Sequence, residues 1–471
     1  MTFTPHQYQR EAIDFLLDRL FVAGQKGAGL FLDPGLGKTA ITLSAVSALQ
    51  NLGEVRQTLI VAPLRVIYNV WPNEIAKWGF DLSTAIVHGT PTARLRALHS
   101  GADVLLINPD GINWLSKQTL PEGIDLLVLD ESTKFKNWGT QRMKALKKLL
   151  PQIPRRAILT GTPSPNSLAD LFAQVFVLDD GETLGKTVTY FRHRYMRQGG
   201  FRGRQWLVAD GCEGDIEAAI APLVLRLSAE DHLDMPPLVK NEIRVNLPAE
   251  IARAYRRLER ELFLALASGE SITASGAGAK YALCRGVANG GAYQVDDVTG
   301  ERSPVHVHDT KVEAAADVAE ELMGKPVLIA YAFNHDLGRL RSHRLFANAP
   351  VIKGGVPADE VARTIEAWNA GRLPVLLAQP QAMSHGLNLQ GGPGRDVIWF
   401  GLTDSLEDYL QFNARIYRQG VTGQVRIHHI IANGTVDEAI WDRIQRKDDN
   451  QRSLLDSLNE YRLAREGVQS V

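Results

Sequence analysis

The chain has 471 residues, more than one hydrophobic core usually organises, which predicts two or three domains. Its 52 Lys and Arg residues almost balance 53 Asp and Glu residues, which excludes a uniformly basic surface and leaves only local patches for nucleic acid. No apolar run approaches the roughly 18 residues of a membrane span, and the start of the chain lacks a signal-peptide pattern. We therefore expect a cytoplasmic protein without membrane contact. Cys212 and Cys284 lie far apart without CxxC spacing, which argues against a disulfide framework or a zinc site.

Short apolar runs alternate with helical patterns in the first part of the chain. Apolar residues recur with helical spacing over Gln9–Phe21. Buried strands separated by helices predict a parallel sheet covered on both faces, so we expect an α/β lobe over residues 1–178. Its expected strands are Gly29–Leu32, Leu59–Ala62, Val104–Ile107, Leu126–Leu129 and Ala157–Leu159.

A glycine-rich loop follows the first of these runs and precedes a helical pattern over Ala40–Ala48. It reads Asp33, Pro34, Gly35, Leu36, Gly37, Lys38, Thr39. Glycines let backbone N–H groups approach phosphates, the lysine reaches the β- and γ-phosphates, and the threonine hydroxyl holds Mg²⁺. Leu32 stands where the full phosphate-loop pattern has its first glycine, so an ordinary glycine-rich turn is the alternative.

An acidic pair, Asp130 and Glu131, ends the apolar run at Leu126–Leu129. Such a pair alone is often a solvated turn. After a phosphate loop and at the carboxyl edge of a parallel sheet, it instead favours nucleotide hydrolysis. Asp130 would then bind Mg²⁺ and Glu131 would polarise the attacking water. The two features together predict a site for a nucleotide's phosphates and Mg²⁺.

The alternation stops near residue 180 and returns after residue 305. For residues 179–305 we expect a helical insert and linker, either a surface insertion or a hinge, with a hairpin between Ala292–Val295 and Val305–His308. A helix at Val312–Met323 and renewed apolar runs predict a second α/β lobe over residues 306–434. Thr435 and Glu438 predict a capping box for a helix in the final segment, 435–471, that runs past Trp441. The expected strands of the second lobe are Val327–Ala330, Val375–Ala378, Val397–Phe400 and Ile427–Ile431.

Two groups of cations stand out. Arg415 and Arg418 lie three apart, so on a helix they share a face and suit fingers that reach a γ-phosphate; a plain basic helical face is the alternative. The stretch 186–206 holds six cations with interleaved aromatic residues and no acid. Either its cations contact phosphate, or its aromatic residues face the core while the arginines are solvated. The six are Lys186, Arg192, Arg194, Arg197, Arg202 and Arg204.

Together these residues resemble the motifs of superfamily-two helicases, specifically the Swi/Snf-type branch of DNA translocases. Gln9 resembles the glutamine that recognises adenine, and the loop at 33–39 resembles motif I. Pro63-Leu64-Arg65 resembles the loop of motif Ia that binds the nucleic-acid backbone. The order and spacing agree over about residues 5 to 450, and the compact chain looks most like the versions carried by phages. The remaining matches are DEST at 130–133 (motif II), LTGTP at 159–163 (motif III), SHGLNL at 384–389 (motif V), 411–420 (motif VI) and GTVDEAI at 434–440 (brace helix).

The resemblance implies two RecA-like lobes with a helical insert and hinge, and an ATPase that translocates on double-stranded DNA. A phage or host nuclease or a replication protein is the implied partner, and the cytoplasm of an infected or prophage-carrying bacterium the location. Two alternatives are a strand-separating helicase on single-stranded DNA or RNA, and an ATP-gated DNA scaffold that recruits a nuclease. The implied roles are ATP binding for Gln9, residues 33–39 and Gln411, coupling for Ser132, Thr160, Gly161 and Thr162, and DNA binding for Arg65, Arg192, Arg194, Arg197, Ser384 and His385.

Overall fold

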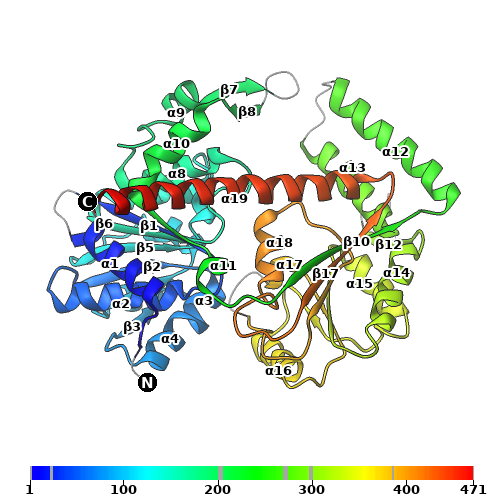
Figure 1. Cartoon of the computed structure of the whole chain (residues 1–471), viewed down its shortest axis with the longest axis horizontal. Helices are drawn as coiled ribbons and strands as arrows, with labels where there is room; N and C mark the ends of the chain where they lie inside the picture. The colour runs from blue at the N-terminus through cyan, green and yellow to red at the C-terminus, as the bar shows by residue number, and fades with distance from the viewer. Residues whose placement is uncertain are drawn as a thin grey trace. The chain divides into compact units, whose positions relative to one another are not determined.

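The structure, a computed structural model, describes residues 3–21, 25–199, 205–268, 274–295, 301–383 and 387–469. The chain divides into two compact units, one of Met1–Leu233 with Lys447–Val471 and one of Asp234–Arg446. Each is built on its own sheet with helices packed around it (Figure 1). Within the described ranges, no helix is both long and apolar enough to cross a membrane.

The first unit contains a seven-stranded parallel sheet in the order β3-β4-β2-β5-β6-β1-β9. Its central strands are apolar runs buried on both faces, as all six residues of β1 illustrate, which is typical of a sheet between two helical layers. The strands are β1 (Gly27–Leu32), β2 (Gln57–Val61), β3 (Thr84–Ile86), β4 (Val104–Ile107), β5 (Ile124–Asp130), β6 (Arg155–Thr160) and β9 (Val224–Leu227).

Helices flank this sheet, and a small antiparallel hairpin extends the unit. In α1 (Gln7–Phe21), Tyr8, Ala12, Leu16 and Leu20 recur every fourth residue and are buried, so one face of the helix packs on the core. The hairpin joins β7 (Met196–Gly199) to β8 (Gln205–Val208). The other helices are α2 (Lys38–Asn51), α3 (Leu64–Asn69), α4 (Trp71–Trp78), α5 (Pro91–Leu98), α6 (Ile112–Leu115), α7 (Gln141–Leu149), α8 (Leu171–Asp179), α9 (Val188–Tyr195), α10 (Cys212–Ile220) and α11 (Ala229–His232).

The second unit contains a six-stranded parallel sheet in the order β10-β17-β16-β13-β15-β14. The strands are β10 (Leu238–Val245), β13 (Val327–Ala330), β14 (Val351–Ile352), β15 (Val375–Ala378), β16 (Asp396–Trp399) and β17 (Val425–Ala432). A hairpin of β11 (Gly291–Val295) and β12 (Arg302–His306) lies outside the sheet. The helices are α12 (Ala249–Ser268), α13 (Ala274–Asn289), α14 (Thr310–Glu321), α15 (Asn334–Ser342), α16 (Ala358–Asn369), α17 (Pro380–Met383), α18 (Leu406–Asn413) and the start of α19 (Val436–Gln469), which from Lys447 on belongs to the first unit.

The predicted fold class, α/β with two parallel-sheet lobes, is confirmed. Strands β4, β13 and β15 have the expected bounds, and the expected hairpin forms with Gly291 opposite His306. The stretch 179–305 does more than form an insert. It supplies β9, which pairs with β1, and β10, which pairs with β17, so it adds an edge strand to each sheet.

The predicted capping box at the start of α19 is wrong, because only one of its two predicted residues caps the helix. Thr435 does cap the helix, because its Oγ1 accepts a hydrogen bond from the backbone N–H of Asp437 at 3.2 Å. The carboxylate of Glu438 instead lies 3.4 Å from the guanidinium of Arg244. The helix runs past Trp441 as predicted and ends at Gln469.

Candidate active site

The glycine-rich loop follows β1 in the first unit and leads directly into α2. Gly35 and Gly37 have φ angles of 100° and 83°, which favour glycine. A Cβ at Gly37 would also lie 2.6 Å from Nε2 of Gln9, so a larger residue there would displace the Gln9 amide. The loop therefore exposes backbone N–H groups at a helix N-terminus, the arrangement that binds phosphate.

Gln9 of α1 packs against this loop and is 6% exposed. Its Nε2 donates to the carbonyl of Leu36 at 3.1 Å, and its Oε1 accepts from the backbone N–H of His6 at 3.0 Å. Gln9 therefore joins the start of α1 to the loop. Its contact with adenine stays a prediction.

Lys38 opens α2, and its ammonium group donates to the carbonyl of Leu32 at 2.7 Å. Gly161, after β6, lies beside it: a Cβ there would be 3.2 Å from the oxygen of Leu32 and 3.7 Å from Nζ of Lys38. The segment predicted as motif III thus borders the phosphate loop within the same unit. Thr39, whose hydroxyl is the predicted Mg²⁺ ligand, is the next residue of α2.

We expected Asp33 to contact the nucleotide. In the structure its carboxylate instead contacts two residues outside the loop. Its oxygens lie 2.9 Å from the guanidinium of Arg226 and accept the backbone N–H of Ala229 at 3.0 Å. Both partners come from the segment of β9 and α11. The side chain of Asp33 therefore anchors the loop to the edge strand.

Asp130 ends β5 and is held by a tryptophan. The indole Nε1 of Trp71 donates to its Oδ2 at 3.1 Å. Burial raises the pKa of Asp130, and this rise is opposed by the charge of Lys38 and by hydrogen bonds from Trp71 and the backbone of Glu131. Lys38 and Asp130, from the predicted motifs I and II, are therefore close enough to interact electrostatically.

Glu131 has φ 57° and ψ 60°, the left-handed conformation that non-glycine residues rarely adopt. It turns the chain sharply from β5 into a 3₁₀ turn at Ser132–Phe135. Strained backbone of this kind persists where the surrounding structure imposes it and is concentrated at functional sites. The geometry thus supports the importance of the acidic pair.

A buried glutamine that no sequence motif indicated connects the predicted motifs II and III. The hydroxyl of Ser132 donates to Oε1 of Gln174 at 2.6 Å, and Nε2 of Gln174 donates to the carbonyl of Pro163 at 2.7 Å. Beside Pro163, the backbone N–H of Thr162 donates to Oγ1 of Thr160 at 3.0 Å. A lone glutamine in the otherwise apolar run of α8 was the available sequence signal.

The predicted DNA-binding cations of this unit lie on two helices and a strand. Arg65 is partly buried in α3. In α9, the guanidinium carbon of Arg192 lies 5.1 Å from the ring centroid of Trp206, and Arg194 donates to the hydroxyl of Tyr190 at 3.2 Å. In β7, Arg197 forms an ion pair with Asp210 at 3.2 Å.

Both interpretations of the stretch 186–206 find support in the structure. Phe191 and Tyr195 belong to the core, whereas Tyr190 is 49% exposed and Arg194 and Arg197 face solvent. Arg202 and Arg204 lie outside the described residues, so the structure tests only part of this stretch.

In the second unit, the expectation that Arg415 and Arg418 lie on a helix is wrong. Helix α18 ends at Asn413, Arg415 follows in a turn and Arg418 in a bend. The guanidinium of Arg415 donates to the carbonyl of Gln411 at 3.0 Å and to that of Leu387 at 2.8 Å, which binds the helix end to the loop after α17.

The other predicted residues of this unit are only partly described. Gln411 is buried in α18. Ser384 and His385, predicted to bind DNA, lie outside the described residues.

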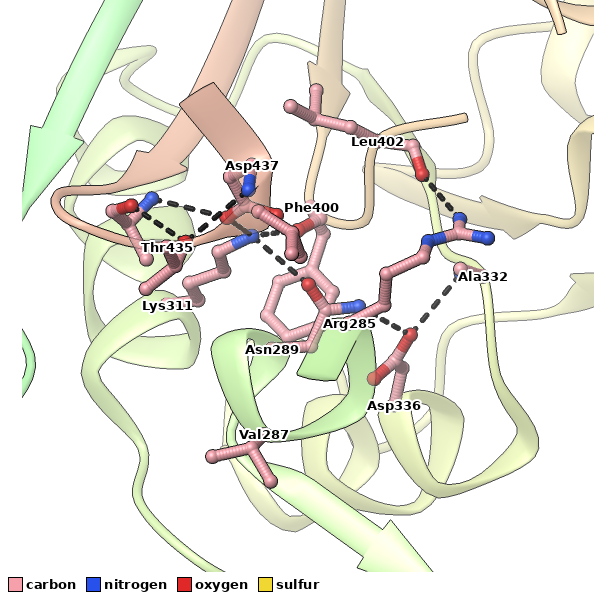
Figure 2. Close-up of polar contacts among 12 residues, drawn as sticks. Arg285, Val287, Asn289, Lys311, Ala332, Asp336, Phe400, Leu402, Thr435 and Asp437 are labelled. Atoms are coloured by element: carbon pink, nitrogen blue, oxygen red, sulfur yellow. Dashed lines mark hydrogen bonds and ion pairs between the residues drawn. The ribbon is translucent and has the colours of Figure 1, made fainter. Parts of the chain in front are cut away.

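The second unit also holds a buried polar cluster centred on Lys311 of α14 (Figure 2). The Lys311 ammonium group is 0% exposed and lies 2.5 Å from the carboxylate of Asp437, 2.9 Å from Oδ1 of Asn289 and 3.3 Å from the carbonyl of Phe400. Asp437 also accepts the backbone N–H of Ala432. These contacts join the start of α19 to α13, α14 and β17.

The cluster continues to the rim of a small cavity. Nδ2 of Asn289 donates to Asp336 at 3.0 Å, and Asp336 accepts the backbone N–H of Ala332 (Figure 2). Asp336 also accepts the backbone N–H of Phe333. Ala332 and Phe333 line a cavity of about 140 Å³ at the carboxyl ends of β13, β15 and β16, and Arg285 at the same cavity donates to the carbonyl of Leu402 at 2.7 Å. The cluster therefore fixes the loops at the edge of the sheet where ligands of parallel α/β folds bind.

Two parallel-sheet units, one with a phosphate loop beside a strand-end acidic pair, define a nucleotide-hydrolysing α/β protein. The SNF2-related domain family matches residues 8–283. The p41 protein of Acyrthosiphon pisum secondary endosymbiont phage 1 is 36% identical over 97% of this chain and 99% of its own length. The DNA annealing helicase and endonuclease ZRANB3 of Bos taurus is 24% identical over 99% of this chain but only 43% of its own length. The Sulfolobus solfataricus SWI2/SNF2 ATPase core in complex with dsDNA has a TM-score of 0.46 and 23% identity, covering 97% of this chain and 94% of that one.

The chain belongs to the SNF2-related family, and it is accordingly a helicase-like, DNA-dependent ATPase. The resemblance seen in the motifs, including its phage-type character, is thereby confirmed. The chain spans less than half the length of the cellular relative ZRANB3, so the activities of that whole protein do not transfer with the family.

Proposed function

We propose that the chain couples ATP hydrolysis to translocation along double-stranded DNA. The observation that supports this best is the meeting of three predicted motifs in the first unit. The ammonium group of Lys38 interacts with Asp130, and Gly161 borders the loop that carries Lys38. A segment beside the phosphate loop is well placed to respond to the state of the nucleotide.

In this proposal each side chain has one chemical task. Lys38 and the loop N–H groups bind the phosphates, and Glu131 accepts the proton of the water that attacks the γ-phosphorus. Gln411 contacts the nucleotide, and Arg415 and Arg418, as finger residues, offset the charge that develops on the γ-phosphate in the transition state. The reaction breaks the bond between the β–γ bridging oxygen and the γ-phosphorus, and releases ADP and phosphate.

The proposed Mg²⁺ ligands fit the preferences of that ion. Thr39 at the start of α2 offers a hydroxyl and Asp130 at the end of β5 a carboxylate, and Mg²⁺ is usually held by one or two such oxygens together with substrate phosphates. When bound, the ion would neutralise phosphate charge. The hydrogen bond from Trp71 keeps the carboxylate of Asp130 oriented.

Coupling of hydrolysis to movement would run through Gln174. A change at Glu131 moves Ser132 directly, and Ser132 is hydrogen-bonded through Gln174 to the carbonyl of Pro163. Thr160, Gly161 and Thr162 would then carry this change toward the surface that grips DNA. The residues that we propose to bind DNA at this surface are Arg65, Arg192, Arg194, Arg197, Ser384 and His385.

The experiment measures steady-state ATP hydrolysis with blunt duplex DNA, single-stranded DNA and RNA, each over a range of concentrations. We expect the blunt duplex to stimulate hydrolysis most, and a Lys38→Ala variant to remain inactive with all three. Stimulation by single strands with none by the blunt duplex would instead support a strand-separating helicase.

A partner nuclease or replication protein, and location in the cytoplasm of an infected or prophage-carrying bacterium, belong to the same proposal. What supports them is the similarity to a phage protein over nearly the whole chain. Co-purification of the tagged chain from infected cells would identify such a partner.

A further inference from the structure

The helix α12 carries a stripe of four arginines, Arg253, Arg256, Arg257 and Arg260, which we name the α12 stripe. All four are exposed. At about 100° per residue they fall within an arc of about 100° of the helix surface and span about 10 Å along its axis. The opposite face packs inward through the buried Tyr255 and the partly buried Leu258. The stripe therefore faces solvent along two helical turns.

The arginines of this stripe share residues 249–261 of the helix with three glutamates but form no ion pair with them. None of its four guanidinium groups pairs with a described carboxylate; those of Arg253 and Arg256 donate to the carbonyls of Ala249 and Ala252 in their own helix. The exposed carboxylates of Glu250 and Glu261 flank one edge of the stripe, and the partly buried Glu259 lies beside the other edge.

Several other exposed arginines of this unit have a carboxylate partner. Arg344 pairs with Glu320 at 2.7 Å, Arg363 with Asp359 at 3.0 Å and Arg372 with Glu366 at 3.4 Å. Arg341 and Arg446, also exposed, donate instead to the backbone carbonyls of Ala349 and Asp442. The α12 stripe differs in that four neighbouring arginines on one helical face all lack a described carboxylate partner.

We infer that the α12 stripe binds the phosphate backbone of duplex DNA, as a contact additional to the residues of the helicase motifs. Guanidinium groups are the preferred donors to phosphate oxygens, and one or two helical turns of them neutralise several charges at once. In a chain with formal net charge −1, a local concentration of four cations is the feature that nucleic-acid binding requires. The inference rests on the proposed function, since it assigns one more contact to the same DNA.

Duplex DNA fits this surface better than a protein partner does. Protein interfaces depend on aromatic or large apolar anchors at their centre. Among the described residues 249–261 of α12 no large apolar side chain is exposed, so the stripe offers charge and hydrogen-bond donors alone. Such a surface contacts the backbone without reading the base sequence.

The test replaces Arg256, Arg257 and Arg260 with Gln and measures the affinity of the full chain for a blunt duplex over a range of salt concentrations. We expect the slope of log affinity against log salt to become shallower by about 0.9 for each phosphate that the variant no longer neutralises, and by at least about 1.8 in total. ATP hydrolysis without DNA should be unchanged, because the α12 stripe is not part of the phosphate loop.

A matched variant removes three paired surface arginines, with Arg344, Arg363 and Arg372 changed to Gln. It loses the same charge from the same unit and should keep the wild-type slope. A folded α12 variant with an unchanged slope would overturn the inference and leave the proposed function intact. Equal shallowing in both variants would also overturn it, because the effect would then be one of net charge. A wild-type chain whose hydrolysis no DNA stimulates would overturn the proposed function, whatever the two slopes.

Discussion

At the scale of single residues, the first unit concentrates unusual backbone and side-chain environments around one loop. Glu131 has a left-handed backbone conformation, burial raises the pKa of Asp130 next to Lys38, and Gly37 has a positive φ angle and packs against Gln9. Each of these features costs stability unless the surrounding structure supports it. Their coincidence at the ends of β1 and β5 is what a hydrolytic site requires.

The Glu131→Gln variant should bind ATP and hydrolyse almost none of it. The amide keeps the shape of the side chain but cannot accept a proton from water. Nucleotide binding and turnover of the purified variant are measured side by side, with the exposed Glu122→Gln as the control. Hydrolysis at the wild-type rate would remove Glu131 from the mechanism.

The Gln174→Met variant should lower the free energy of unfolding by about 1–3 kcal/mol, the usual cost of leaving buried polar groups unsatisfied. Ser132 loses its acceptor, and the carbonyls of Pro163 and Asp170 lose their donor. Urea unfolding measures the change. The exposed Gln152→Met should change stability by less than about 0.5 kcal/mol. An equal effect of the two substitutions would show that the buried link adds nothing.

At the scale of elements, the start of α19 is fixed to the second unit by the ion pair of Lys311 and Asp437. Breaking such a buried pair from one side leaves a charge without its partner, so Lys311→Met should cost about 3–5 kcal/mol of unfolding free energy. In the double variant with Asp437→Leu both charges are gone, and the loss should be clearly smaller than the sum of the two single losses. Strict additivity in this double-mutant cycle would contradict a direct interaction.

A buried histidine makes the same unit sensitive to acid. His429 of β17 is 0% exposed and lies between Tyr409 of α18 and Trp441 of α19. Its Nδ1 faces the carbonyl of Asn241 at 3.2 Å and its Nε2 the hydroxyl of Tyr409 at 3.0 Å, which suits a neutral ring that donates to the first and accepts from the second. Burial lowers the pKa of His429 to about 3 from its ordinary 6.5.

The unfolded chain therefore binds this proton at a higher pH than the folded chain, and stability falls as the pH drops below about 6.5. Between pH 7 and pH 5, His429 should remove about 2 kcal/mol of unfolding free energy. A His429→Phe variant should be less stable at pH 7. Its unfolding free energy should fall by about 2 kcal/mol less than that of the wild type between pH 7 and pH 5. Urea unfolding at the two pH values measures this, and identical losses for wild type and variant would contradict it.

Much of both sheets could be predicted from apolar runs, because strands buried on both faces have few other sequence patterns. Strand β10 was missed because it is an edge strand whose residues are only partly buried or exposed in alternation, so Lys240, Glu242 and Arg244 hide its pattern. The phosphate loop and acidic pair were found because their chemistry fixes residue types in sequence. The roles of Gln174 and Lys311 could not be found from the sequence, since their partners are brought together only by packing.

The turn after α18 shows the same limit. The spacing of Arg415 and Arg418 suggested a helical face. The helix instead ends at Asn413, whose side chain accepts from the indole of Trp399, and Arg415 takes up the carbonyl of Gln411 in the last turn. Both contacts are made by side chains or join residues that are distant in sequence, and local sequence periodicity does not predict such contacts.

At the scale of the whole molecule, the proposed function divides its residues between the two parallel-sheet units of the chain. The first holds the phosphate loop, and the second holds the turn with Arg415 and Arg418 and the α12 stripe. The formal net charge of −1 means that DNA must be held by local groups of cations. Binding to DNA should therefore weaken steeply with salt, while hydrolysis without DNA should not.

The central claim, ATP-driven movement along duplex DNA, is tested most directly by displacement of a third strand from a blunt duplex that carries it at one end. We predict that the wild-type chain releases the third strand with ATP, that it does not with a non-hydrolysable analogue, and that Glu131→Gln does not with either. The duplex itself should remain paired. Unwinding of a tailed duplex without release of the third strand, or release that needs no hydrolysis, would contradict the account.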